Sequence, residues 1–435
     1  MWMVGCVGDF APTHRTIHTP THIMQHYKRW VIFTAAFFLV LSASLVGSAH
    51  LYYMAAILLV LPLISYGLGM VSLRDVAFAR ELPPSGWDGE TVEFRLVVRS
   101  TSRMARLFLE ARDHLPAWLK PADSESVVFS VPARALSRIP YRVQLLKRGA
   151  YQLESVSVTA LDPLGIFSFT KRFEAPGEML VYPVPEPISD IVLSGAERYG
   201  FRELPIAATK GSGIDPDGVR EYIPGDPLRR VHWKSTARTG HLSVIEFEES
   251  RAVNVVLALD ISRGAQIGEG KESTFEYQVR VAASLAQSAI RQGASVRLVT
   301  GDAITPASAS GRGSDHLYEV LGDLARAEPE DDSKMSAELV QRVGSLTAGT
   351  TLVVLTSGLD KELPESLSHY TADGAQVVVV YADPRSFDPN SGISKREQHT
   401  LMEGFHSANT APFVLSANPQ SALRLESAQD ARYFE

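Results

Sequence analysis

The run Val253-Asn254-Val255-Val256-Leu257-Ala258-Leu259-Asp260 predicts the fold class of the C-terminal part of this 435-residue chain. An apolar run of strand length that ends in a polar residue is typical of a parallel strand buried on both faces. A helix is expected next, from about Thr274 to Gln292, because Ser273 and Glu276 have capping-box spacing and Gly293 can end it. Further strands are expected at Ser295–Thr300, Thr351–Leu355, Gln376–Tyr381 and Pro412–Leu415, with another helix opening near Ser314.

Strands that alternate with helices predict a doubly wound α/β domain with a mostly parallel sheet, here over residues 251–427. Ligands of such sheets bind at the carboxyl ends of the strands. Asp260 and Ser262 follow the first strand, and Ser314 opens a helix after a glycine-rich loop. These residues are therefore candidates for a ligand or metal site.

This domain resembles the von Willebrand factor A fold, whose metal site uses an Asp-x-Ser-x-Ser loop with a distant Thr and a distant Asp. The resemblance places Asp260 and Ser262 in the loop and Ser314 at the Thr position. Gly264 and Ser357 replace the second Ser and the second Asp. A hard divalent ion such as Mg²⁺ needs oxygen ligands in a near-octahedral array. The resemblance therefore implies either a degenerate Mg²⁺ site or a von Willebrand factor A-like scaffold whose site has decayed.

A basic motif precedes this domain and runs Gly-Asp-Pro-Leu-Arg-Arg-Val-His-Trp-Lys-Ser-Thr-Ala-Arg-Thr-Gly-His over residues 225–241. Asp226 can cap a helix that starts at Pro227, and Gly240 can end it. The cations of this helix are spaced four residues apart, so they would share one face. The candidate partner-binding residues of the motif are Gly225, Asp226, Arg229, Arg230, His232, Trp233, Lys234 and Arg238.

Three interpretations of the basic face remain open. In the first, the cations pair with Glu246, Glu248 and Glu249 of the following strand, or with another acidic surface of the chain, and the helix only docks. In the second, the face binds an acidic partner or a phosphate. In the third, His232 is catalytic together with a carboxylate, although no nucleophile or metal set accompanies it.

Residues 81–185 are expected to form a small antiparallel β-sandwich. Apolar residues alternate with polar ones from Val92 to Val98 and again from Tyr141 to Leu145. This period of two, interrupted by Pro and Gly turns, is typical of an antiparallel sheet with one solvated face. The proline-rich stretch Tyr182–Pro187 marks a boundary. Residues 186–250 are therefore expected to be a linker that carries the basic motif.

Residues 30–73 contain no Asp, Glu, Lys or Arg. This stretch has about twice the ~20 residues that cross a bilayer once. It divides at the turn-like cluster Gly47-Ser48-Ala49-His50. The pattern predicts two transmembrane helices in a hairpin, and a hairpin buried in a soluble core is the alternative. Residues 1–29 are expected to be a disordered tail, with Met24 as an alternative start to Met1.

The charges that flank the hairpin predict its orientation. Lys28 and Arg29 precede the first helix, Arg74 and Arg80 follow the second, and the turn has no Lys or Arg. The positive-inside rule then places both ends in the cytoplasm. We therefore expect a two-span protein of a bacterial inner membrane, with both termini and the main domains cytoplasmic and with lipid as one of its partners.

The composition argues against several classes of function. The 42 Lys and Arg residues against 49 Asp and Glu give a net charge of −7, which argues against a protein that coats nucleic acid. Cys6 is the only cysteine, so an intrachain disulfide and a cysteine metal cluster are excluded. The sequence has no Walker phosphate loop, no Gly-x-Ser-x-Gly elbow and no His-Glu-x-x-His helix. We therefore expect no nucleic-acid ligand and no enzymatic activity.

The whole arrangement, over roughly residues 30–427, resembles the bacterial domain of unknown function 58 family. The hallmark of that family is similar to the Gly-Asp-Pro-x-Arg-x-x-x-Trp-Lys-x-x-Ala-Arg run at Gly225–Arg238. Such proteins are commonly encoded beside MoxR-type AAA ATPases. The resemblance implies a membrane-anchored adaptor that works with such an ATPase in the assembly or maturation of other proteins. A divalent-metal-dependent binding module and an enzyme of unrecognised type, using His232, Trp233 or Lys234, are the alternatives.

Overall fold

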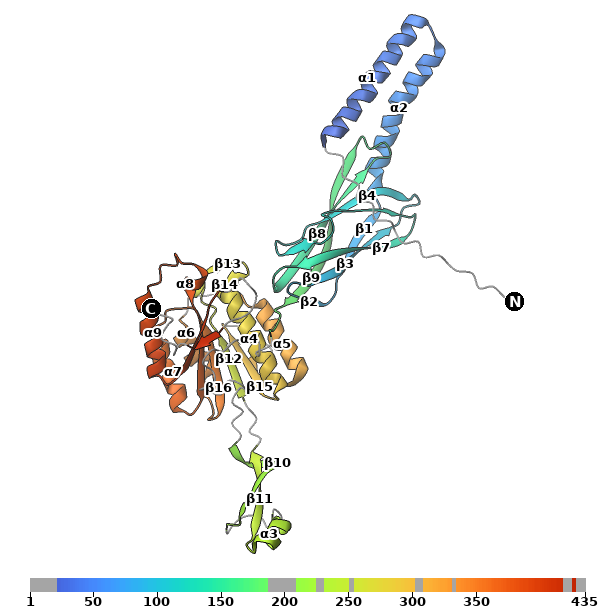
Figure 1. Ribbon diagram of the computed structural model, residues 1–435. Coiled ribbons are helices and arrows are strands. Elements are labelled where there is room, and N and C mark those ends of the chain that lie inside the picture. The colour runs from blue at the N-terminus through green and yellow to red at the C-terminus, as the bar shows by residue number, and fades with distance from the viewer. Residues whose placement is uncertain are drawn as a thin grey trace, which may run out of the picture. The chain divides into compact units, whose positions relative to one another are not determined.

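The computed structural model describes residues 22–186, 209–223, 231–249, 254–301, 308–330, 334–417 and 425–427 (Figure 1). The chain forms two compact units, residues 1–146 with 151–179 and residues 147–150 with 180–435. The boundary after residue 179 lies close to the one expected from the proline-rich stretch. Most of the expected N-terminal tail lies outside the described residues.

The first unit begins with two antiparallel helices, α1 (His22–Val46) and α2 (Ala49–Ser72), drawn in blue in Figure 1. Gly47 joins them with a φ of +69°, a conformation that glycine adopts without strain. Both helices are long and apolar enough to cross a membrane. The predicted pair of long apolar helices, divided at Gly47, is therefore confirmed.

Two antiparallel sheets follow the helices. In the first sheet the order is β1 (Val76–Glu81), β3 (Thr91–Ser100), β7 (Leu136–Leu145) and β5 (Leu119–Pro121). In the second the order is β2 (Ser85–Trp87), β9 (Ser168–Tyr182), β8 (Gly149–Leu161), β4 (Arg106–Asp113) and β6 (Val127–Val131). Leu96 and Val98 of the first sheet share one buried cluster with Leu109 and Val158 of the second. The expected strand-rich domain is therefore present, as two sheets that share one buried core.

The second unit is built on a six-stranded sheet in the order β15-β12-β16-β17-β18-β19. The first five strands run parallel, and β19 pairs antiparallel with β18. Every residue of β16 is buried, as expected for a strand covered on both faces. The bounds are β12 (Asn254–Leu259), β15 (Ser295–Thr300), β16 (Thr350–Thr356), β17 (Gln376–Ala382), β18 (Ala411–Leu415) and β19 (Leu425–Ser427).

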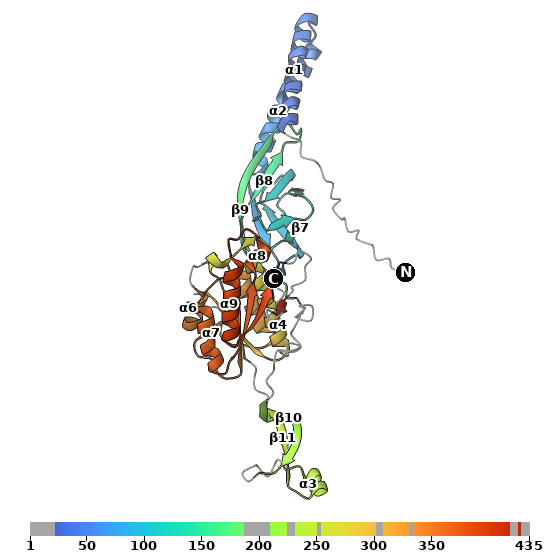
Figure 2. The same ribbon diagram turned by 60° about the vertical axis from the view of Figure 1, so that its left-hand side comes forward.

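Helices cover both faces of this sheet (Figures 1 and 2). On one face α4 (Thr274–Arg291) packs against α5 (Gly313–Arg326). The Ser273 hydroxyl accepts a hydrogen bond from the Glu276 amide, 3.3 Å away, so the expected start of α4 is confirmed. The other face carries α6 (Met335–Glu338), a π-helical turn (Leu339–Val343), α7 (Leu363–Ala372) and α9 (Lys395–Ser407), and α8 (Pro384–Phe387) follows β17.

The second unit also contains an antiparallel ribbon of β10 (Thr209–Glu221) and β11 (Ser243–Glu249), with α3 (Trp233–Thr239) between the two strands. Gly240 ends α3 with a φ of +74°, as expected. One continuous helix from Pro227 to Gly240 is not formed, because Val231 and His232 are not helical and α3 begins at Trp233. Residues 224–230, which include Gly225, Asp226, Arg229 and Arg230, lie outside the described residues.

The late start of α3 has a tertiary cause. Val231 forms an antiparallel bridge to Val244 of β11, and the His232 amide donates to the Ser243 carbonyl at 2.8 Å. These pairs hold the chain extended just before the helix. The His232 ring caps α3, because its Nδ1 accepts from the Ser235 amide at 3.3 Å.

Candidate functional site

The order of the strands identifies the edge where a ligand would bind. β15 lies on one side of β12, and the next strand, β16, lies on the other side. The order in which strands are added therefore reverses between β12 and β16. In open α/β sheets the crevice outside the carboxyl ends of two such strands is the usual ligand site. Asp260 follows β12 and Thr356 ends β16, so both residues lie at this crevice.

Asp260 is the centre of a small hydrogen-bonded cluster. Its Oδ1 accepts from the Ser262 amide at 2.9 Å and from the Ser262 hydroxyl at 2.5 Å. Its Oδ2 accepts from the Thr356 hydroxyl at 2.5 Å, which joins the ends of β12 and β16. Both oxygens of this buried carboxyl are therefore satisfied within the protein, as buried polar groups generally are.

The pKa of Asp260 is raised above its ordinary value. Burial is the main cause, because it disfavours the charged form, and the nearby charge of Asp360 acts in the same direction. The hydrogen bonds from Ser262 and Thr356 oppose this shift because they stabilise the carboxylate. Asp260 is thus a carboxyl whose ionisation depends on the hydroxyls around it.

Ser314 does not join this cluster. Gly311, three residues earlier, forms an antiparallel bridge to Val296, and Val296 pairs with Val255 near the amino end of β12. The chain therefore crosses to the opposite edge of the sheet before α5 begins. Asp260 and Ser314 lie at different ends of the strands.

The donor set at the carboxyl edge does not fit the implied Mg²⁺. Asp260 supplies one carboxylate whose oxygens already accept three hydrogen bonds. Ser357, which replaces a metal-binding Asp in the resemblance, turns its hydroxyl to the Ala265 carbonyl at 2.6 Å. Within the described ranges no three His, Cys, Asp or Glu residues lie together as a metal-holding group. The cluster is therefore arranged as a set of internal hydrogen bonds.

Sequence reasoning missed Thr356 as the partner of Asp260. The two residues are 96 positions apart, and only the parallel pairing of β12 with β16 brings them together. A hydroxyl at the end of a buried apolar strand was the available signal. It becomes specific only when the neighbouring strand is known.

The other site predicted from the sequence, the basic motif, is exposed at three of its candidate residues. Trp233 is 68% exposed, and Lys234 and Arg238 are exposed on the same short helix, four residues apart. No ion pair of Lys234 or Arg238 is recorded within the described residues. His232 bonds with Ser235, its Nδ1 2.8 Å from the hydroxyl, and caps α3. The motif thus presents an aromatic ring and two cations to the surroundings.

Comparison with known proteins matches part of the chain to one family. The sequence model of the family described as "Protein of unknown function DUF58" matches residues 218–395. The match begins within β10, includes α3, and ends at the first residue of α9. It therefore covers both the basic motif and most of the parallel sheet.

Two relatives extend this comparison. "Uncharacterized protein YeaD" of Bacillus subtilis is 24% identical over 331 residues, which cover 74% of this chain and 80% of the relative. "Uncharacterized protein Rv1480" of Mycobacterium tuberculosis is 29% identical over 140 residues, which cover 31% of this chain and 43% of the relative. The similarity to the Bacillus protein thus extends well beyond residues 218–395.

Two solved structures with local similarity carry no conclusion about this protein. The CARDB domain of the PF1109 protein from Pyrococcus furiosus has a TM-score of 0.18 at 10% identity, and covers 25% of this chain and 92% of its own. A Salmonella alpha-2-macroglobulin has a TM-score of 0.20 at 13% identity, and the match covers 36% of this chain and 9% of the macroglobulin. Both scores are too low to establish a shared fold.

Proposed function

We propose that this protein is a non-enzymatic, membrane-anchored adaptor or scaffold that binds a partner protein through α3. The observation that carries the proposal is the exposed set Trp233, Lys234 and Arg238. The partner that we propose is a MoxR-type AAA ATPase, which rests on the family resemblance. The adaptor would work with it in the assembly or maturation of other proteins.

The chemistry of α3 suits recognition of an acidic protein surface. Tryptophan and arginine are enriched among the residues that contribute most to protein interfaces, because they bury a large area and also form polar contacts. An exposed Trp beside two cations offers an apolar anchor with charges around it. A complementary partner surface would carry an apolar pocket bordered by Asp or Glu, and it would associate faster at low salt.

The carboxyl edge of the sheet supports a scaffold rather than an enzyme. Ser262 and Thr356 both donate hydrogen bonds to the buried Asp260, which supports a structural role for this cluster. We propose that this domain is von Willebrand factor A-like with a decayed metal site. The strand order and the retained Asp260–Ser262 loop support that proposal.

The surface of α1 and α2 supports membrane anchoring. Only 11% of the first candidate span and 22% of the second are buried, whereas the core helices of soluble proteins are mostly buried. Large apolar side chains such as Phe37, Phe38, Ile57 and Leu63 are exposed along the pair. Lipid would cover this surface, because exposing so much apolar area to water is unfavourable.

Contacts at the base of the hairpin support the cytoplasmic orientation of the β-sandwich. The Arg29 Nε donates to the Ile166 carbonyl at 3.0 Å, and Arg29 also lies over the Phe167 ring. Ser65 of α2 donates to Asp162, and Asp162 also accepts from the Phe167 amide at 2.7 Å. The cationic end of the hairpin is therefore the end that holds the sandwich. The positive-inside rule then favours a cytoplasmic location for the cationic end of the hairpin and for the sandwich.

Affinity purification of the full-length chain from a detergent extract tests the adaptor function. We expect a MoxR-type ATPase to be enriched with the wild type and lost with the double variant Lys234→Glu/Arg238→Glu. The matched control is Arg291→Glu/Lys361→Glu, which reverses two exposed cations of the α/β domain outside α3. Binding of the purified ATPase to the purified chain in detergent then establishes direct contact.

The adaptor proposal fails if no ATPase is enriched over a tag-only control and the purified proteins do not bind. It also fails if both double variants lose binding equally, because the effect would then come from overall charge. The melting temperature of each variant is measured alongside. A variant that lowers it strongly is replaced by Trp233→Ala.

A further inference from the structure

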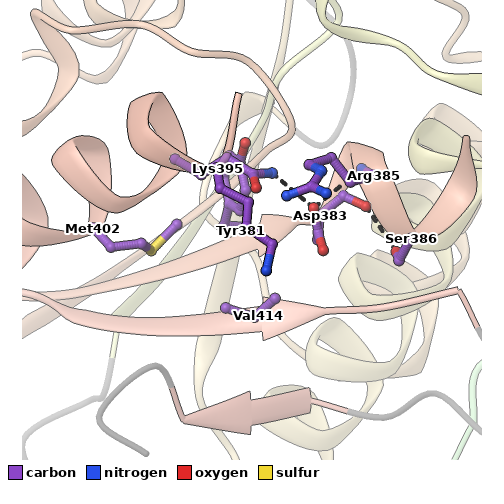
Figure 3. Close-up of a pocket in the computed structure, with 8 residues that line it drawn as sticks. Tyr381, Asp383, Arg385, Ser386, Lys395, Met402 and Val414 are labelled. Carbon is purple, nitrogen blue, oxygen red and sulfur yellow. Dashed lines mark hydrogen bonds between the residues drawn. The ribbon is translucent and has the colours of Figure 1, made fainter. Parts of the chain in front are cut away.

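A pocket lies at the carboxyl edge of the sheet, beside other strands than the Asp260 cluster. It is formed at the ends of β17 and β18 and at the start of α9, and its volume is about 240 Å³ (Figure 3). Tyr381, Asp383, Arg385 and Lys395 contribute its polar lining, while Met402 and Val414 contribute apolar surface. No motif in the sequence drew attention to these residues.

Tyr381 shows that the pocket has an unmet polar group. The residue is 1% exposed, and its hydroxyl has no hydrogen-bond partner among the described residues. Burial raises the pKa of Tyr381, and the charge of Asp383 acts in the same direction. The Gln398 side chain lies close enough to the hydroxyl to oppose this shift, although it forms no hydrogen bond of proper geometry with it. The phenol therefore stays neutral and can donate. Buried polar groups without a partner are rare, and a bound ligand is one way to supply one.

Asp383 is held in place beside this phenol. Its Oδ1 accepts from the Gln398 amide at 2.7 Å and from the Arg385 backbone amide at 3.1 Å. Its backbone carbonyl accepts from the Ser386 hydroxyl at 2.7 Å. No hydrogen bond to Oδ2 is recorded in the part of the chain that the structure describes. One carboxylate oxygen is therefore open while the other fixes the side chain.

Two cations line the same pocket. Arg385 lies in α8, two residues after Asp383, and Lys395 is the first residue of α9. Neither has an ion pair recorded within the described residues. Lys395 also stands at the N-terminus of a 13-residue helix, where the backbone dipole adds positive potential. The pocket thus joins a positive region to one open carboxylate oxygen and a neutral donor.

We propose that this pocket binds a small zwitterion of the α-amino-acid type. Its carboxylate would bind Arg385 and Lys395, and its ammonium group would bind the open oxygen of Asp383. The Tyr381 hydroxyl would donate to the same carboxylate, and Met402 and Val414 would contact the apolar part. A zwitterion would give a partner to each charged group of the lining. A simple anion would instead be repelled by the carboxylate of Asp383.

The volume agrees with a ligand of this size. About 240 Å³ corresponds to the space of roughly eight water molecules. Pockets that hold drug-sized ligands are larger, at roughly 300–1,000 Å³. A free amino acid fits the available space. The carboxyl terminus of a peptide has the same carboxylate but no free ammonium group beside it, so the two sources can be told apart.

Calorimetry and thermal unfolding of the full-length chain in detergent test the proposal. The probes are the twenty amino acids, their N-acetyl forms, succinate, 1,4-diaminobutane and inorganic phosphate. We expect at least one free amino acid to bind and to raise the melting temperature, and the other probes to have no effect. Binding of the N-acetyl forms, succinate or phosphate as tight as that of the free amino acid overturns the zwitterion. No binding by any amino acid overturns the site.

Variants locate the binding within the pocket. Lys395→Ala should raise the dissociation constant about tenfold, because a charge-assisted hydrogen bond is lost. The matched control is Arg396→Ala, since Arg396 is adjacent on α9 but lines the groove between α7 and α9. A twofold change or less is expected for that control. Equal effects of the two variants would contradict the assignment.

Tyr381→Phe separates ligand binding from a structural role of the phenol. Without ligand, its melting temperature should equal or exceed that of the wild type, because an unpartnered buried hydroxyl is removed. With ligand, the dissociation constant should rise several-fold. A lower melting temperature with unchanged affinity would overturn the role of Tyr381. Failure of this site leaves the adaptor function untouched, because that function rests on α3.

Discussion

The carboxyl end of β12 and the surface of α3 both carry charged residues that the sequence singles out, but their charges are treated differently. Asp260 is 2% exposed and accepts hydrogen bonds from Ser262 and Thr356. Lys234 and Arg238 are exposed, and no ion pair is recorded for them within the described residues. One region satisfies its carboxyl within the fold, and the other has its cations exposed on a short helix.

This difference separates stability from recognition. A buried carboxyl must find donors inside the fold, because burial without them is costly. An exposed cation is hydrated and contributes little to stability, so it is available for binding. We therefore expect substitutions at Asp260 to act on folding and substitutions on α3 to act on association. The following predictions test whether Asp260 acts on stability and α3 acts on association.

Asp260→Ala should have the largest effect on stability. Two donors of Ser262 and the hydroxyl of Thr356 lose their acceptor in a buried place. We expect the free energy of unfolding to fall by about 2–4 kcal/mol, measured by thermal unfolding of the full-length chain in detergent. Thr356→Val removes one of these donors and also the acceptor of the Gly358 amide, 3.1 Å away, and should cost about 1–2 kcal/mol. A fully stable Asp260→Ala protein would show that the cluster is not structural.

Trp233→Ala should have the next largest effect, and it should act on binding alone. Loss of an anchoring tryptophan commonly costs about 2 kcal/mol of binding free energy, or roughly thirtyfold in affinity. The affinity for the purified ATPase and the melting temperature are both measured. Leu136→Ala, which truncates an exposed apolar residue of β7, is the control and should change neither. A large fall in the melting temperature of Trp233→Ala would instead place this side chain in the fold.

His232→Ala should have a smaller and local effect. The ring caps α3 through the Ser235 amide, and loss of a cap costs about 0.5–1 kcal/mol. Hydrogen exchange of residues 231–240 should become faster, while His232→Asn should restore protection because Asn is a strong cap. If function in a deletion strain is lost in both variants although protection is restored, His232 has a chemical role beyond capping.

The pH dependence of the Asp260 contribution should be the smallest effect. The folded state raises the pKa of Asp260 above the unfolded value near 3.8, so the folded protein binds more protons between the two values. The stability contributed by this group is fully present below about pH 3.8 and is lost as the pH rises through the folded pKa. Melting temperatures of the wild type and Asp260→Asn are compared from pH 4 to 8. The wild type should lose stability relative to the variant as the pH rises; an unchanged difference would contradict the shift.

Local patterns predicted those features that depend on neighbours along the chain. The uncharged run at residues 30–73, the cap at Ser273 and the glycine at 240 all specify local geometry, and the structure contains each as expected. The reciprocal half of the capping box is not formed, because the Glu276 carboxylate is bound by Arg148. The start of α3 could not be predicted in this way. The motif has helical spacing from Pro227 onward, but Val231 is held in an extended conformation by its pairing with Val244.

The candidate sites also separate features that local sequence predicts from features that depend on tertiary pairing. Asp260 and Ser262 are two residues apart, so the sequence alone places them together. Ser314 was expected to join them, but the bridge between Gly311 and Val296 shows that the chain has already returned to the other edge. The pocket at Tyr381 left no recognisable spacing, because its lining comes from two strand ends and the start of a helix.

Local patterns in the sequence were enough to predict the two long apolar helices, the parallel sheet with its helices, and the basic and aromatic composition of the motif. These features follow from periodicity and from residue chemistry, which act over a few neighbouring residues. The tertiary structure alone decided that Thr356 satisfies Asp260, that Ser314 lies elsewhere and that α3 starts at Trp233. Each of these depends on strand order and register, which join residues far apart in the chain.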